Sequence, residues 1–167
     1  MIRTLEALAV LLTAVVMALS LAHALELPGK MRLPRETYLA TQAIYYPGFT
    51  IGGIAEPLAA IALFALLLLV PAGSTRFWLI LFALIALAAV HVVFWIWVQP
   101  INRIWLKDID LGSASAAFFG TKVTAAGARD RDTQNWTSLR DQWEYGHAVR
   151  AVLAMIGLTL LAIAVTD

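Results

Sequence analysis

The chain has 167 residues, of which 61% are hydrophobic and 14% charged, whereas soluble domains are about 45–50% apolar and about 25% charged. It contains no cysteine, which excludes a disulfide-stapled secreted domain, an iron–sulfur cluster and a cysteine nucleophile. The formal net charge of +1 gives no field that would attract nucleic acid, so we expect no nucleic-acid partner. The apolar residues occur in long blocks, which excludes a disordered chain and an ordinary soluble enzyme.

Four apolar stretches have the length of a membrane-spanning helix, which needs about 20 residues to cross the hydrocarbon core. Alanine and leucine dominate these stretches, which favours helix, and the strands of a membrane barrel would instead alternate polar and apolar residues. We therefore predict an all-α fold, a four-transmembrane-helix bundle that forms a single integral membrane domain over residues 1–167. The predicted spans are residues 5–25, 49–70, 77–98 and 146–165.

The first span has an alternative interpretation. Its basic start, its apolar stretch and the sequence Ala22-His23-Ala24 together resemble a signal peptide that would be cleaved from residues 1–24. The apolar stretch is longer than the usual signal-peptide core of about 7–15 residues, and removing it would leave three helices poorly paired. We therefore expect this segment to be retained as a spanning helix.

The connections between the spans set the predicted topology. Residues 71–76 form a tight turn, so the second and third spans make an antiparallel hairpin. The two long segments, residues 26–48 and 99–145, lie on the same side because two crossings separate them. That side carries nine Lys and Arg residues, and the opposite side carries Arg3 and Arg76. The positive-inside rule predicts that the long segments are cytoplasmic and that both termini lie outside the cell membrane.

Local signals refine the ends of these helices. Residues 36–46 are expected to form a short interfacial helix that stops at Pro47, and Pro100 is expected to end the third span. The last helix is predicted to begin near Thr133, well before the membrane, because its residues recur at steps of three and four. The stripe comprises Trp136, Leu139, Arg140, Trp143, His147, Arg150 and Ala154.

Ionisable residues within the spans form the strongest functional signal. A charge at the bilayer centre costs about 2.5–3.5 kcal/mol on insertion scales, so such residues usually face the bundle interior and carry function. Each of the four predicted helices places its ionisable residues in the same half of the membrane, and all three histidines of the chain belong to this set. We expect one shared site built from His23, Glu26, Glu56, His91, Glu144, His147 and Arg150.

A metal or haem site is one alternative for this set. His23 with Glu26, and Glu144 with His147, are i, i+3 pairs that each lie on one helix face, and di-metal bundles use Glu-x-x-His pairs from two helices. The match is partial. A single metal, or a haem with two axial histidines, fits the histidine count equally well. The candidate metal ligands are His23, His91, His147 and Glu56.

Five of these residues also have a structural alternative. His91 could bond to a backbone carbonyl or a neighbouring helix, and Glu26 and Glu144 could be solvated at the membrane edge. Arg150 could extend to the lipid headgroups. Glu56, next to Pro57, could mark a helix start, where a carboxylate is favoured by the helix dipole.

Several motifs together resemble a known family. In the second half these are His91-Val-Val-Phe-Trp, Gln99-Pro-Ile-Asn102 and the stripe that runs from Trp136 through Trp143 and His147 to Arg150. In the first half they are His23-Ala-Leu-Glu26-Leu-Pro28 and Tyr45-Tyr46-Pro47-Gly48. The chain is similar to a family of four-helix integral membrane proteins that includes anthrone oxygenase-like proteins of polyketide pathways. The resemblance implies a membrane bundle and the oxidation of an activated aromatic CH₂ group by O₂. The matched positions are Asn102, Trp143, His147 and Arg150.

These observations lead to a functional hypothesis. A flat lipophilic molecule, aromatic or quinone-like, enters from the bilayer, and His147 or His91 acts as the general base on an acidic C–H bond. Arg150, with Asn102 at the helix mouth, stabilises the enolate oxygen, and dissolved O₂ reacts without a metal. One alternative is a metal- or haem-binding membrane protein. The other is a non-catalytic accessory subunit or a small carrier, and a carrier of this size would need to form a homodimer.

Overall fold

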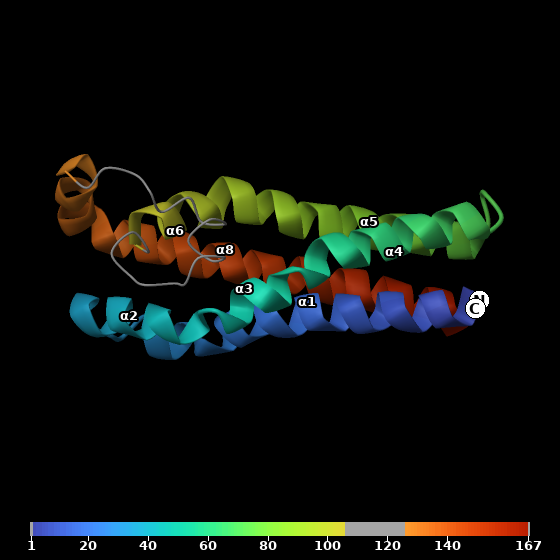
Figure 1. Ribbon diagram of the computed structural model, residues 1–167, viewed down its shortest axis with the longest axis horizontal. Helices are drawn as coiled ribbons and strands as arrows, with labels where there is room; N and C mark the ends of the chain where they lie inside the picture. Colours follow the sequence, from blue (N-terminus) through green and yellow to red (C-terminus); the bar gives the residue numbers. More distant parts are fainter. Residues whose placement is uncertain (1, 106–125, 167) are drawn as a thin grey trace.

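The computed structural model describes residues 2–105 and 126–166, with side chains from residue 135 onward in the second range. Within these ranges the chain forms helices and no strand, and the long helices run side by side along one elongated bundle (Figure 1). Four stretches are long and apolar enough to cross a membrane, namely Ile2–Lys30, Gly48–Leu69, Thr75–Trp105 and Asn135–Thr166. The predicted all-α bundle of four spans is confirmed.

The first crossing is α1 (Ile2–Lys30), and the second consists of α3 (Gly48–Gly53) and α4 (Ala55–Leu69). The third crossing is α5 (Thr75–Val93), followed by a π-helical turn, η2 (Phe94–Val98), and α6 (Gln99–Trp105). The fourth is α8 (Ala126–Thr166). Between the first two crossings lie the short helices α2 (Arg35–Thr41) and η1 (Gln42–Tyr45), where the sequence predicts an interfacial helix over residues 36–46.

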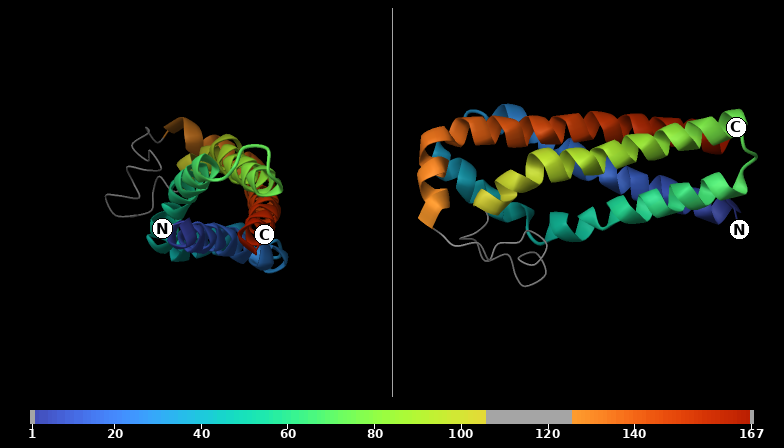
Figure 2. Two further views of the ribbon diagram at one scale, coloured as in Figure 1. Left: turned by 90° about the vertical axis from the view of Figure 1, so that its right-hand side faces the viewer. Right: turned by 90° about the horizontal axis from the view of Figure 1, so that it is seen from above.

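Both termini and the α4–α5 turn lie at one end of the bundle, and α2, α6 and the start of α8 lie at the other (Figures 1 and 2). At the first end, Ser74 caps α5 by accepting a hydrogen bond from the backbone N–H of Phe77, and Arg76 forms an ion pair with Glu6 of α1. The predicted hairpin and the shared side of the two long segments are confirmed. Of the basic residues on that side, Lys107 and Lys122 lie outside the described residues, and the cytoplasmic orientation stays a prediction.

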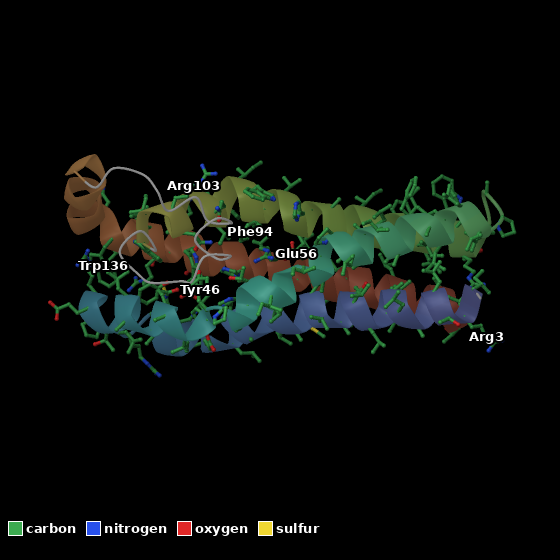
Figure 3. The ribbon with its side chains drawn as sticks, viewed as in Figure 1. Arg3, Tyr46, Glu56, Phe94, Arg103 and Trp136 are labelled. Carbon is green, nitrogen blue, oxygen red and sulfur yellow. The ribbon has the colours of Figure 1, made fainter. Side chains whose placement is uncertain are left out.

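The second crossing is interrupted at Ile54, the residue that separates α3 from α4. Pro57 lies in the first turn of α4, where a missing backbone N–H breaks no helical hydrogen bond. Glu56 lies in the same first turn, as expected for a residue that marks a helix start. The interruption leaves Glu56 near the middle of the bundle, well away from the end marked by Arg3 (Figure 3).

The third helix does not end at Pro100, so that prediction is wrong. The helix continues through η2 and α6 to Trp105. The reason is that the π-helical turn of η2 carries one residue more per turn and shifts the hydrogen-bond register. Pro100 then becomes the second residue of α6, where its missing N–H is tolerated.

The last helix begins before the membrane, as predicted, although at Ala126 and not near Thr133. A non-helical backbone at Asn135 (φ −132°, ψ 26°) bends it, and the first turns lie at a sharp angle to the rest (Figure 2). The predicted stripe faces the bundle, because Trp143, His147 and Arg150 are buried.

The two halves of the bundle differ in what fills them. Toward the chain termini the interior is an apolar core, with Leu63, Leu66, Ile80 and Leu161 fully buried. Toward α2 the interior contains the buried polar and charged side chains His23, Lys30, Glu144, His147 and Arg150. The structure therefore concentrates its buried ionisable side chains in one half of the bundle.

Candidate functional site

A cavity of about 440 Å³ lies in the polar half of the bundle. Its wall includes residues from all four crossings, and aromatic rings and alkyl groups make up most of it. The predicted residues that line it are His23, Glu56, His91, Asn102, His147 and Arg150. The structure therefore brings every predicted catalytic residue and every candidate metal ligand to the wall of one cavity.

The chemical character of this wall is mixed. Phe49 and Phe94 contribute aromatic rings, and Leu19 and Ile54 contribute aliphatic side chains. Ile51, Ile54 and His91 belong to the wall and are also exposed on the outside of the bundle. The cavity therefore opens between the α3–α4 junction and α5, on a surface that would face lipid.

Glu56 joins three helices at the cavity wall. Its carboxylate accepts a hydrogen bond from Nη2 of Arg150 on α8, and its other oxygen lies 3.2 Å from Nδ1 of His91 on α5. Arg150 is 7% exposed, so it does not extend to the headgroups, and that alternative is wrong. Glu56 is thus both the start of α4 and the counter-ion of a buried guanidinium.

His91 has partners at both ring nitrogens. Nε2 accepts a hydrogen bond of 2.9 Å from the indole N–H of Trp95. An indole N–H can only donate, so Nε2 carries no proton and Nδ1–H points to Glu56. The neighbouring-helix bond that the sequence left as an alternative for His91 is therefore present, and His91 is a neutral imidazole with no unengaged lone pair.

His147 is held in the opposite neutral tautomer, with its proton on Nε2. Nη1 of Arg150 lies 3.2 Å from its Nδ1, and because a guanidinium can only donate, Nδ1 is the acceptor. The proton of the neutral ring is then on Nε2, a buried atom that has no hydrogen-bond partner in the described part of the chain. His147 consequently presents an unsatisfied N–H donor.

His23 packs directly against His147, with 4.1 Å between the ring centroids. Three further rings surround it, those of Tyr45 at 4.5 Å, Phe49 at 4.6 Å and Trp143 at 5.0 Å. Its Nδ1 is buried and has no hydrogen-bond partner among the described residues. The two imidazoles are therefore an enclosed pair inside an aromatic shell.

Trp143 connects this pair to the end of the third crossing. Its indole N–H donates to Oδ1 of Asn102 at 2.8 Å, and its ring lies 4.2 Å from that of His147. Nδ2 of Asn102 lies 3.5 Å from Oε1 of Gln99. Asn102 thus orients Trp143, which in turn packs on both buried histidines.

A second buried cluster closes the cavity end of the bundle. Nζ of Lys30 lies 3.0 Å from Glu144 and 3.5 Å from Glu26, and it faces the ring of Trp143 at 4.8 Å. Glu144 has no exposed surface, so the alternative of a solvated edge residue is wrong for it, whereas the Glu26 side chain is 40% exposed.

Two tyrosines from the first long segment complete this cluster. The Tyr38 hydroxyl donates to Glu144 at 2.8 Å, and the Tyr45 hydroxyl donates to Glu26. Burial, followed by the charge and hydrogen bond of Glu144, raises the pKa of Tyr38 above its ordinary value. Burial and the hydrogen bond to Glu26 likewise raise the pKa of Tyr45.

The arrangement does not favour the metal and haem alternatives. Among residues 2–105 and 135–166, no group of three or more His, Asp or Glu side chains has a geometry that could hold a metal ion. The rings of His23 and His147 touch, so no haem plane fits between them as axial ligation would require.

Some of the cavity residues were not identified from the sequence. Tyr45, Tyr46, Phe49 and Phe94 line the cavity, and along the length of the bundle Phe94 lies between Tyr46 and Glu56 (Figure 3). Tyr45 and Tyr46 belong to the motif that ends at Gly48, and Phe94 belongs to the motif that begins at His91. Neither motif identifies a cavity wall, because aromatic residues near a membrane surface are common without any site. Lys30 was counted only as a basic loop residue.

Comparison with known proteins identifies the family. The family model described as anthrone oxygenase matches residues 49–160, a range that contains Glu56, His91, Asn102, His147 and Arg150. Comparisons with curated proteins and with solved structures found no match. Because the family model covers more than half of the chain, this integral membrane protein belongs to the anthrone oxygenase family.

Proposed function

We propose that this protein oxidises an activated CH₂ group of a flat, lipophilic aromatic molecule, with O₂ as the oxidant. The observation that carries the proposal is the cavity wall itself, where aromatic and aliphatic side chains surround a small number of buried, unsatisfied nitrogen atoms. Ligand sites typically combine an apolar wall with a few fixed polar groups. The opening at exposed residues of α3 and α5 supports entry from the bilayer.

The unsatisfied nitrogens favour a substrate with a carbonyl oxygen. Nε2 of His147 and Nε of Arg150 are both buried donors without a hydrogen-bond partner in the described residues. A buried donor that lacks a partner is unfavourable, and a ligand oxygen would remove that penalty. The same two donors would stabilise the negative charge that develops on this oxygen when the neighbouring C–H bond loses its proton.

The proposed reaction balances with O₂ as the only co-reactant. A neutral histidine of the cavity takes a proton from the CH₂ group, and the electron pair of the C–H bond moves into the enolate. The enolate carbon then forms a bond to O₂, and the resulting peroxide takes up a proton. Loss of water from this hydroperoxide converts the carbon to a ketone, so that CH₂ and O₂ yield C=O and H₂O.

Anthrone is the probe for this proposal, because its CH₂ group lies between two aromatic rings and opposite a carbonyl. We expect the purified protein in detergent to convert anthrone to anthraquinone with one O₂ consumed for each molecule formed. Ser20→Leu should abolish this activity because Ser20 is buried in the cavity wall. Ala18→Leu, on the exposed face of the same helix, is the matched control and should retain it. A wild-type protein that neither converts nor binds anthrone would contradict the proposal and favour an accessory role.

A further inference from the structure

The three histidines differ in which ring nitrogens are free to accept a proton. This difference concerns the first step of the proposed reaction, and the inference rests on that proposed function. Both nitrogens of His91 are engaged, by Trp95 and by Glu56. The acceptor nitrogen of His147 is engaged by Arg150. Neither residue offers a free lone pair to a substrate in this arrangement.

His23 is different. It lines the cavity, it is 4% exposed, and its contacts within the described residues are packed rings and not hydrogen bonds. Among residues 2–105 and 135–166, no arginine or indole N–H donates a hydrogen bond to His23, and its Nδ1 is buried without a partner. A neutral imidazole always carries one lone pair, so His23 provides a basic nitrogen that is not already used.

We propose that His23 is the proton acceptor of the site. The C–H bond of the bound CH₂ group breaks, a new N–H bond forms on His23, and the electron pair moves to the carbonyl oxygen beside His147 and Arg150. The division of labour follows from the contacts: His147 and Arg150 donate hydrogen bonds to the oxygen, and His23 accepts the proton. His23 lies outside residues 49–160, the range that matches the family model, so the matched range alone does not assign this role.

Proton removal can be measured without the oxidation. We would incubate anthrone with the detergent-purified protein in D₂O under argon and follow deuterium incorporation at the CH₂ group by mass spectrometry, subtracting the rate in protein-free micelles. General-base catalysis contributes typically about 10²–10⁴-fold, so His23→Gln should lower the catalysed exchange rate at least about 100-fold. Leu25→Ala, on the exposed face of α1, is the control and should exchange as the wild type does.

Two further measurements separate chemistry from folding and binding. The unfolding midpoint in SDS and the quenching of tryptophan fluorescence by anthrone should be close to wild type in His23→Gln, and His23→Asn serves as a second variant of different length. Exchange that persists in folded His23→Gln would overturn the role of His23 while leaving the oxidation intact. Absence of exchange in the wild type would overturn the proposed function together with this inference.

Discussion

The imidazoles of His23 and His147 lie in contact, with 4.1 Å between their centroids, although they come from the first and last crossings of the bundle. Trp143, one turn before His147 on α8, packs on both rings. The contact places the middle of α8 against the last two turns of α1, and both histidines line the cavity there. The histidine pair is therefore a consequence of helix packing, and its chemistry depends on that packing.

Replacing His147 by Ala should abolish turnover of anthrone, because the variant loses the N–H donor that would bind the developing oxyanion. The side chain lines the cavity, and it also packs on the rings of His23 and Trp143. Its removal loses these ring contacts, so we expect the free energy of unfolding in detergent to fall by about 1–3 kcal/mol while the variant still folds. Loss of the folded state in this variant would instead indicate a structural role.

The sequence predicted the crossings and their polar interior because both follow from the free-energy cost of exposing polar groups to lipid. An apolar stretch of sufficient length must be a helix in lipid, and a charged group within it must face the interior. These rules predict that Glu56, His91 and His147 face one another between the helices, without any knowledge of the packing. They apply equally to Arg150, whose burial against Glu56 decides between the interior and the headgroup alternatives.

Other features could not be read from the sequence. The π-helical turn before Pro100 depends on how α8 packs against η2, and no local residue pattern distinguishes it from a helix end. The pairing of Lys30 with Glu144 joins positions from the two ends of the chain, so only the fold reveals it. The roles of the individual histidines depend on hydrogen-bond partners such as Trp95, which the sequence shows only as a residue one turn away.

Breaking the ion pair between Glu56 and Arg150 should destabilise the fold. In Glu56→Gln the buried guanidinium loses its counter-ion, and removing one partner of a buried pair costs about 3–5 kcal/mol. The double variant Glu56→Gln/Arg150→Met removes both charges, so it should be more stable than Glu56→Gln alone. SDS titration of the purified variants measures these free energies, and a double variant less stable than the single one would contradict the pairing.

Close packing between α8 and η2 requires a glycine at position 146. A Cβ atom on Gly146 would lie 2.9 Å from Cγ2 of Val98, and Val98 has no exposed surface into which it could move. Gly146→Leu should therefore lower the free energy of unfolding by about 1–3 kcal/mol, as overpacking typically does. Gly29→Leu is the matched control, because a Cβ atom there meets nothing within 4 Å, and equal destabilisation of the two variants would argue against this contact.

Alkaline pH should destabilise the protein through its buried tyrosines. Burial and the carboxylate of Glu144 raise the pKa of Tyr38 in the folded state, so above about pH 10, the ordinary tyrosine pKa, the unfolded chain loses a proton that the folded chain keeps. Stability present below that pH is then lost as the pH rises further, because fewer protons are bound in the unfolded state. Tyr38→Phe should flatten this decline in an SDS titration repeated at increasing pH, whereas Tyr145→Phe, at an exposed position, should leave the slope as in the wild type. An unchanged slope in Tyr38→Phe would show that other groups cause the decline.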